Sequence, residues 1–244
     1  MYYRLIRFDN RDVGLSHNYN NFNLLYRLWR SLLKRFFGVP LYTLQDMARD
    51  TFHIMQALHI NKAHIIGISL GGMIGQRFAL MYPKHTQSLT CIMAAAGAPH
   101  PTEKLVNTIS KPKTIDDIIQ NRIDHVKELI GPIHTETDEN IRVRVTRSIL
   151  RNINAGKGTD CKQRQYEARM ADDHRKHLLQ YITIPTLILH GEADPRTPVS
   201  EAYALKNLIN GSKLVTFSGM GHDLPAPLIS DITNEIISFI KLLD

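Results

Sequence analysis

The chain has 244 residues, of which 43% are hydrophobic and 22% charged, and its formal net charge is +7. This length suits one large domain with an insertion, and the composition is that of an ordinary globular protein. No apolar run approaches the roughly 20 residues of a membrane-spanning helix, which excludes a protein built from such helices. Met1 to Arg4 lead into an expected strand rather than a long apolar core. We therefore expect no signal peptide and a cytoplasmic protein.

The positive charge is concentrated at the start of the chain. Residues 1–35 contain seven basic and two acidic side chains, and such a patch favours acidic surfaces. No aromatic interleaving and no nucleic-acid recognition motif accompany it, so we expect no nucleic-acid partner.

The first third of the chain predicts one strand, at residues 2–8, and two helices. Residues 44–58 carry a helical apolar stripe, and residues 23–37 carry a clearer one. The apolar residues of the 23–37 stripe are Leu24, Leu25, Leu28, Trp29, Leu32, Leu33 and Phe36, with basic side chains on the opposite side. We interpret this helix as packing on the core or near a pocket rim. The alternative is peripheral contact with an anionic membrane.

Residues 67–71, with the sequence GISLG, have the form G-x-S-x-G. A serine hydroxyl attacks a carbonyl only where it protrudes from the backbone, and a sharp strand-to-helix turn achieves this. We expect both flanking glycines to let the strand and the helix pass closely. The context fits, because residues 63–68 are an apolar, β-branched run and residues 70–82 have a helical pattern. The pattern predicts Ser69 as a nucleophile and the backbone N–H of Leu70 as one oxyanion-hole donor.

The middle of the chain differs from its two ends. A strand is expected at residues 88–94, and strand-like runs then disappear until about residue 180. Charged helical segments are expected there instead, at 114–130, 138–154 and 162–179. We predict a core formed by residues 1–100 and 180–244, with a helical cap at 101–179.

Two later strand-like runs, 187–190 and 213–217, are each followed by a candidate catalytic residue. Asp194 lies on the loop after the first run, and His222 lies on the loop after the second. The carboxyl ends of parallel strands meet at one edge of a sheet, so we expect both side chains to meet Ser69 there. His222 would act as the base, and Asp194 would orient its imidazole.

These motifs together resemble the α/β-hydrolase fold family, in which nucleophile, acid and histidine follow in this order. The resembling segments are RFDNRDVGLS at 7–16, YTLQDMA at 42–48, HGEADP at 190–195 and GMGH at 219–222. The subgroup that they resemble is the aclacinomycin methylesterase-like hydrolases. The resemblance implies an α/β fold, with a mostly parallel sheet flanked by helices and an inserted helical cap.

The same resemblance implies three more strands ahead of residues 2–8 and a His-Gly loop that donates the second oxyanion-hole N–H. Neither has a counterpart in this sequence, so we expect strands 1–3 and the oxyanion loop to be missing. Two alternatives follow: a protein that begins upstream of Met1, or a decayed or specialised hydrolase.

The prediction is a serine hydrolase that cleaves a small or medium apolar carboxylic ester through an acyl-enzyme intermediate, without a cofactor. Thioester, lactone and cofactor-free haloperoxidase chemistry stay open, as does the oligomeric state, because cap and pocket determine substrate choice. The alternative function is a non-catalytic remnant or a binding protein of the same family. Glu192 and Asp223 are fallback acids.

Two further features have a structural interpretation. Cys91 lies in an expected buried strand far along the chain from Cys161, so free thiols are expected rather than a disulfide. Asp173, His174 and His177 have helical metal-ligand spacing but no further ligand, and we expect no metal site.

Overall fold

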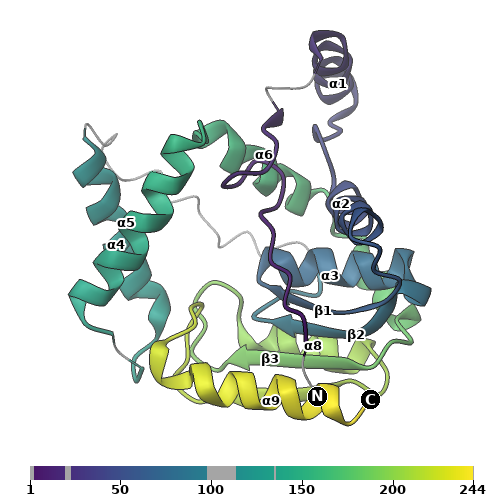
Figure 1. The fold of residues 1–244 in the computed structure, drawn as a ribbon, viewed down its shortest axis with the longest axis vertical. Helices are drawn as coiled ribbons and strands as arrows, with labels where there is room; N and C mark the ends of the chain where they lie inside the picture. Colours follow the sequence, from purple (N-terminus) through teal and green to yellow (C-terminus); the bar gives the residue numbers. More distant parts are fainter. Residues whose placement is uncertain (1–2, 20–22, 98–113, 135, 244) are drawn as a thin grey trace.

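The computed structural model describes residues 3–19, 23–97, 114–134 and 136–243, and Figure 1 shows the arrangement of its elements. In chain order these are α1 (Leu24–Phe37), α2 (Leu44–Ala57), β1 (Ala63–Ile68), α3 (Leu70–Met81), β2 (Thr86–Ile92), α4 (Ile115–Ile130), α5 (Asp138–Asn154), α6 (Thr159–Met170), α7 (Arg175–Leu178), β3 (Thr186–Gly191), α8 (Val199–Leu208), β4 (Lys213–Phe217) and α9 (Ile229–Lys241).

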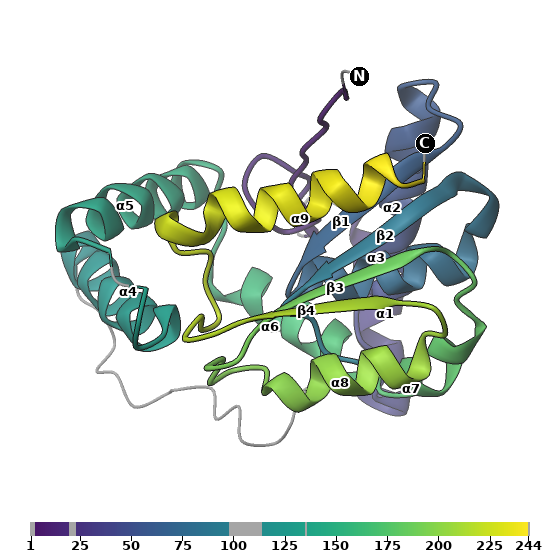
Figure 2. The ribbon, with the colours of Figure 1, turned by 90° about the horizontal axis from the view of Figure 1, so that it is seen from below.

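The four strands form one parallel sheet in the order β1-β2-β3-β4. Leu189 in β3 is opposite Ile92 on one side and Val215 on the other. Because neighbouring side chains of a strand point to opposite faces, each face has its own core. Leu89, Cys91 and Ile188 pack with residues of α3 and α8, and the other face packs with α9. Figure 2 shows α8 and α9 on opposite sides of the sheet.

β1 forms an edge of this sheet. Every residue of β3 is buried, whereas Ile66 and Ile68 of β1 are 42% and 45% exposed. The segment that precedes α1 passes nearby, and the ring centroids of Tyr3 and His64 are 6.1 Å apart. Residues 3–8 nevertheless form no strand. The prediction of a strand at 2–8 is therefore wrong for the described residues, because a strand needs a ladder of hydrogen bonds to a neighbouring strand and the described sheet contains only β1 to β4.

The helix α1 forms where the pattern predicts it but does not pack as expected. None of its residues is buried, and Leu25, Trp29 and Phe36 are 75%, 53% and 70% exposed. Its polar face is turned to the body instead. Arg30 donates to the carbonyl oxygens of Leu41 and Pro40, at 2.9 and 2.7 Å, and Lys34 binds Glu167. The interpretation that the apolar stripe packs on core or cap is therefore wrong in this structure. Among the described helices, none is long and apolar enough to cross a membrane.

A helical insertion separates β2 from β3. Within it, α4 and α5 pack through Ile119, Ile123, Val126, Ile141 and Val145. The predicted helix at 162–179 is two helices, α6 and α7, because the chain turns at 171–174 to bury Asp172 between Arg77 and Arg175. The predicted start of the cap falls within 98–113, outside the described residues, and the domain boundaries stay a prediction.

Candidate active site

Ser69 lies at the tight turn between β1 and α3. Its φ of 52° is in the positive region, which is costly for a residue with a Cβ atom. The turn is held by two backbone hydrogen bonds, from Ser69 N to Ile92 O at 2.8 Å and from Gly72 N to Ser69 O at 2.9 Å. These bonds maintain the strained strand-to-helix conformation that the G-x-S-x-G pattern predicts.

The two glycines of the motif play different parts. A Cβ atom on Gly67 would lie 2.2 Å from the carbonyl oxygen of Gly71, so only glycine fits at position 67. A Cβ atom on Gly71 would meet nothing within 4 Å. The expectation that both glycines permit the close passage is wrong for Gly71. Gly72 is the second close contact, since its Cβ would lie 2.6 Å from the Cβ of Ala94.

Asp194 lies on the loop that follows β3, and its side chain is fully buried. One carboxylate oxygen, Oδ1, accepts hydrogen bonds from the backbone N–H groups of Arg196 and Thr197, at 2.8 and 2.7 Å. This is the local side chain-to-backbone bonding that aspartate favours in turns. The other oxygen, Oδ2, is thereby directed toward His222, whose Nδ1 lies 2.7 Å away.

His222 follows β4 and completes a hydrogen-bonded chain of three side chains. Its Nε2 lies 2.9 Å from Ser69 Oγ. Since Asp194 accepts the hydrogen bond from Nδ1–H, Nε2 is the acceptor for the Ser69 hydroxyl. The helical insertion is hydrogen-bonded to the loop that carries His222, because His222 N donates to Leu129 O at 2.7 Å. The structure thus brings together the three side chains that the sequence analysis singled out.

The remaining candidates from the sequence are Leu70 and the two fallback acids, Glu192 and Asp223. Leu70 is the first residue of α3, so its backbone N–H is a donor without an intrahelical acceptor and lies at the positive end of the helix dipole. The fallback acids have other partners: Glu192 accepts from Thr216 Oγ1 at 2.8 Å, and Asp223 pairs with Arg144.

His190, at the end of β3, is a residue that the sequence analysis missed. Its side chain is fully buried, with Nε2 3.6 Å from Asp194 Oδ2. Nε2 donates to the carbonyl oxygen of Thr197 at 2.8 Å. Burial lowers the pKa of His190, so the imidazole is neutral at neutral pH. His190 therefore packs against the acid loop as a neutral donor, and its place at the start of the HGEADP motif was the available signal.

The loop at 9–16, which carries part of the family resemblance, makes structural contacts. Asp9 binds the guanidinium of Arg151, and this ion pair holds the pKa of the Asp9 carboxyl below its usual range. Arg11 binds Asp50 at 2.7 Å, and Gly14 N donates to Asn152 at 3.0 Å. These bonds attach the loop to α2 and α5.

No group of three metal-ligating side chains occurs in the part of the chain that the structure describes. His174, the centre of the metal-like spacing, lies 2.8 Å from a guanidinium nitrogen of Arg77 and accepts its hydrogen bond. Both cysteines are buried free thiols, as predicted. Burial raises the pKa of Cys91 to about 12, so this thiol is not a candidate nucleophile.

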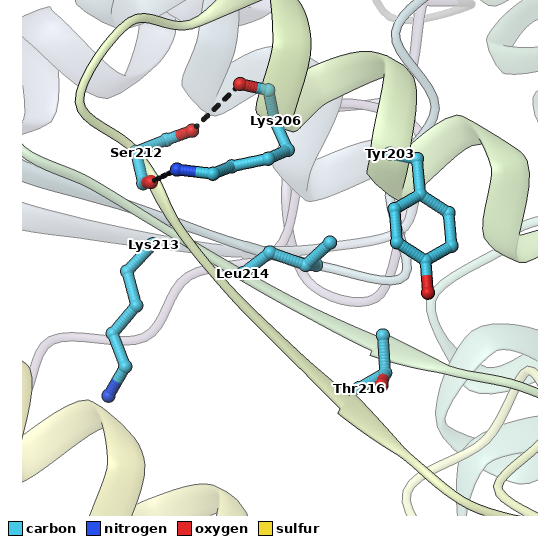
Figure 3. Close-up of a pocket in the computed structure, with 6 residues that line it drawn as sticks. All are labelled: Tyr203, Lys206, Ser212, Lys213, Leu214 and Thr216. Carbon is cyan, nitrogen blue, oxygen red and sulfur yellow. Dashed lines mark hydrogen bonds between the residues drawn. The ribbon is translucent and has the colours of Figure 1, made fainter.

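A surface hollow of about 570 Å³ lies away from the three side chains, between α8 and β4 (Figure 3). Its two lysines already have partners, since Lys206 donates to Ser212 O and Lys213 binds Glu235. Among the residues that line it, the side chains of Lys206 and Ser212 bind backbone oxygens and not each other, so the hollow shows no hydrogen-bonded nucleophile–base pair.

Comparison with known proteins gives the family. A model of the alpha/beta hydrolase fold matches residues 2–225. The chain belongs to the α/β-hydrolase family. Rhodomycin D methylesterase DauP from a Streptomyces species is 26% identical, over 91% of this chain and 76% of that protein. Rhodomycin D methylesterase DnrP from Streptomyces peucetius is 25% identical over the same shares.

Solved α/β-hydrolase structures agree with this fold. The enol-lactonase from Burkholderia xenovorans superposes with a TM-score of 0.71 at 18% identity, covering 96% of this chain and 79% of its own. A meta-cleavage product hydrolase from Pseudomonas fluorescens gives 0.68 at 20% identity, covering 97% and 79%. The predicted family and the resemblance to methylesterases are confirmed, as is the parallel sheet with a helical insertion.

Proposed function

We propose that this α/β-hydrolase cleaves a carboxylic ester through an acyl-enzyme intermediate, with Ser69 as the nucleophile. The observation that carries the proposal is the hydrogen-bonded chain from Ser69 Oγ to His222 Nε2 and from His222 Nδ1 to Asp194 Oδ2. Relatives named as methylesterases, and one named 3-oxoadipate enol-lactonase from Acinetobacter baylyi at 24% identity, support ester cleavage as the reaction class.

The three side chains have distinct roles in this reaction. Ser69 Oγ attacks the ester carbonyl while His222 Nε2 takes its proton and later gives it to the leaving alcohol. Asp194 keeps Nδ1 protonated, because its carboxylate accepts that N–H, and it stabilises the imidazolium that forms. The Leu70 N–H points to the developing oxyanion. Water then attacks the acyl-enzyme by the same route, and the carboxylic acid leaves.

A fluorophosphonate probe tests the nucleophile. We expect it to label the wild-type protein and the Ser200→Ala variant, whose serine lies exposed near the start of α8, but not Ser69→Ala. We also expect Ser69→Ala to lower kcat on an activated ester by about 10⁴-fold or more. Equal labelling of wild type and Ser69→Ala would reject Ser69. An unlabelled wild type would favour the non-catalytic alternative.

We propose further that residues 101–179 form a cap over this edge of the sheet. Two backbone hydrogen bonds support it, from His222 N to Leu129 O and from Gly221 N to Ile130 O, which join the end of α4 to the histidine loop at 2.7 and 3.1 Å. Arg144 of α5 adds an ion pair to Asp223. A substrate whose ester lies at Ser69 would then meet side chains of the cap helices.

A further inference from the structure

The apolar stripe of α1 is exposed from one end of the helix to the other. The exposed side chains that form it are those of Leu24, Leu25, Leu28, Trp29, Leu32 and Phe36. Their spacings of three and four residues place them next to one another on one face of the helix. Single exposed apolar side chains are ordinary on a protein surface, whereas a contiguous apolar patch indicates a binding surface.

Contacts on the opposite face hold α1 in this orientation. Arg30 donates to the backbone carbonyl oxygens of Leu41 and Pro40. Lys34 binds Glu167 of α6 at 2.8 Å. These basic side chains face the body, so the apolar stripe faces away from it. In Figure 1, α1 lies beyond α2 at one end of the longest axis of the molecule, where a flat surface can reach it.

The charge of α1 is entirely positive. The helix contains no acidic residue and four basic residues, Arg27, Arg30, Lys34 and Arg35. Glu167 neutralises Lys34, whereas Arg30 binds uncharged carbonyl oxygens and keeps its charge. Arg35 is exposed and lies beside Leu32, at the border of the stripe. Even with Glu167 counted, the helix keeps an excess of positive charge.

The size and the charge of the stripe favour a membrane over a second copy of the chain. A helix of 14 residues is about 21 Å long and 10–12 Å across, so half of its surface is roughly 400 Å². A stable protein interface buries about 800 Å² on each partner. Two copies that met through this stripe would also bring like charges together, whereas anionic lipid headgroups attract them.

We propose that α1 binds an anionic lipid surface, with its apolar stripe among the acyl chains and its basic side chains at the level of the headgroups. Leucine, tryptophan and phenylalanine on one face and arginine and lysine on the other are typical of helices that lie in the plane of a membrane interface. Arg35 is the cation at the border, and its long stem lets the guanidinium reach headgroup phosphates while Leu32 stays in the apolar layer.

Trp29 makes this binding directly measurable, because it is the single tryptophan of the chain. It is 53% exposed, so its fluorescence reports water in the free protein. We expect vesicles of phosphatidylcholine and phosphatidylglycerol in equal amounts to shift the emission to shorter wavelength, and brominated acyl chains to quench it. Vesicles of phosphatidylcholine alone should bind at least tenfold more weakly, since each basic side chain near an anionic surface contributes about fivefold.

Vesicle flotation then compares variants. The double variant Leu25→Gln with Phe36→Gln should bind the anionic vesicles at least tenfold more weakly, because two large apolar side chains no longer enter the acyl layer. Arg35→Gln should lose about fivefold. The matched controls are Leu242→Gln and Lys241→Gln, because both side chains are exposed and lie at the end of α9, opposite α1 in Figure 1. Both controls should bind as the wild type does.

Salt separates the electrostatic part of the binding from the apolar part. Raising the salt concentration from about 0.1 M to about 1 M shortens the Debye length from about 10 Å to about 3 Å, and binding to the anionic vesicles should weaken. Thermal melting of each variant accompanies these measurements. Arg35→Gln keeps the test valid if the double variant does not fold, because it leaves the apolar stripe intact.

Three results would overturn the proposal. One is a Trp29 emission that anionic vesicles leave unchanged, and another is equal binding to neutral and anionic vesicles. The third is an emission shift that follows protein concentration without lipid, together with a dimer in analytical ultracentrifugation that the double variant abolishes, which would assign the stripe to a second copy. None of these measurements involves ester hydrolysis, so their outcome is independent of the proposed function.

Discussion

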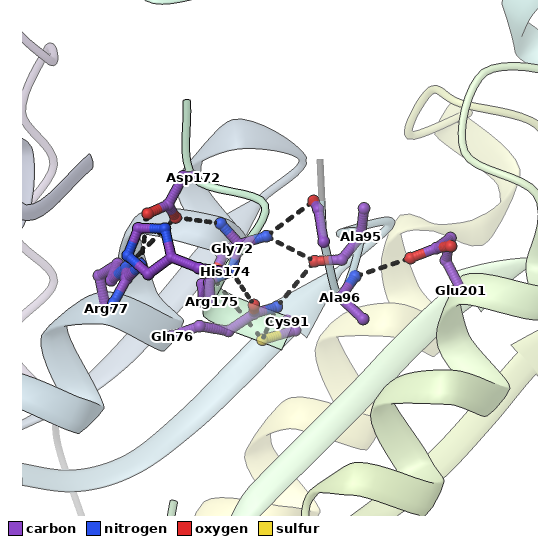
Figure 4. A network of polar contacts seen from close by, with 11 residues as sticks. Gly72, Gln76, Arg77, Cys91, Ala95, Ala96, Asp172, His174, Arg175 and Glu201 are labelled. Atoms are coloured by element: carbon purple, nitrogen blue, oxygen red, sulfur yellow. Dashed lines mark hydrogen bonds and ion pairs between the residues drawn. The ribbon is translucent and has the colours of Figure 1, made fainter. Parts of the chain in front are cut away.

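Replacement of Asp172 by asparagine should strongly destabilise this protein. Asp172 is 2% exposed and lies between two guanidinium groups, of Arg77 (4% exposed) and Arg175 (fully buried). It binds Arg77 Nε at 2.9 Å and Arg175 Nη1 at 2.5 Å (Figure 4). Arg175 also donates to the carbonyl oxygens of Ala95 and Gly97, so the network joins α3, the chain after β2 and the start of α7.

The magnitude follows from what the substitution leaves behind. Burial already lowers the pKa of Arg175, and the Asp172 carboxylate opposes that effect. Without the carboxylate, the two buried cations keep their neutral acceptors but lose the negative charge that they share, and breaking a buried pair costs about 3–5 kcal/mol. The unfolding entropy of about 2.1 cal/mol/K per residue gives roughly 0.5 kcal/mol/K for a chain of this length. We therefore expect Tm to fall by about 6–10 °C.

Calorimetry or circular dichroism measures this shift. The control is Asp138→Asn, which removes a carboxylate that is 78% exposed and paired with Lys127. Exposed pairs contribute about 0–1 kcal/mol, so this variant should melt within about 2 °C of the wild type. If Asp172→Asn also melts within that range, the buried network does not contribute the stability assigned to it, and the reasoning from its burial is wrong.

Two other predictions concern the nucleophile turn and the exposed helix. Gly67→Ala should be insoluble or melt far below the wild type, because its Cβ has no room, whereas Gly71→Ala should fold with little change in Tm; similar behaviour of the two variants would contradict the packing described. Leu25→Gln and Phe36→Gln should each change stability by less than about 0.5 kcal/mol, measured by urea unfolding, because both side chains are exposed. A larger loss in either variant would mean that another surface covers α1.

Local patterns in the sequence determined much of this protein. The runs at 63–68 and 213–217 form β1 and β4 with the predicted bounds, and α5 also matches the helix predicted at 138–154. Period-two and period-3.6 patterns report which residues share a face, and that information is local. The order of Ser69, Asp194 and His222, each on the turn or loop that follows a strand, was sufficient to predict that they meet. Parallel strands place all such loops at one edge of the sheet.

Only the tertiary structure decided the features that depend on contacts between residues far apart in the chain. Residues 3–8 have a strand-like sequence but join no strand of the described sheet, and α1 turns its polar face to the body because Arg30 and Lys34 find acceptors there. The second close glycine contact is at Gly72 because Ala94 happens to lie against it. Asp172 breaks a predicted helix to reach Arg77, 95 positions earlier in the chain. Such contacts follow from packing between separated segments, which no pattern within one segment records.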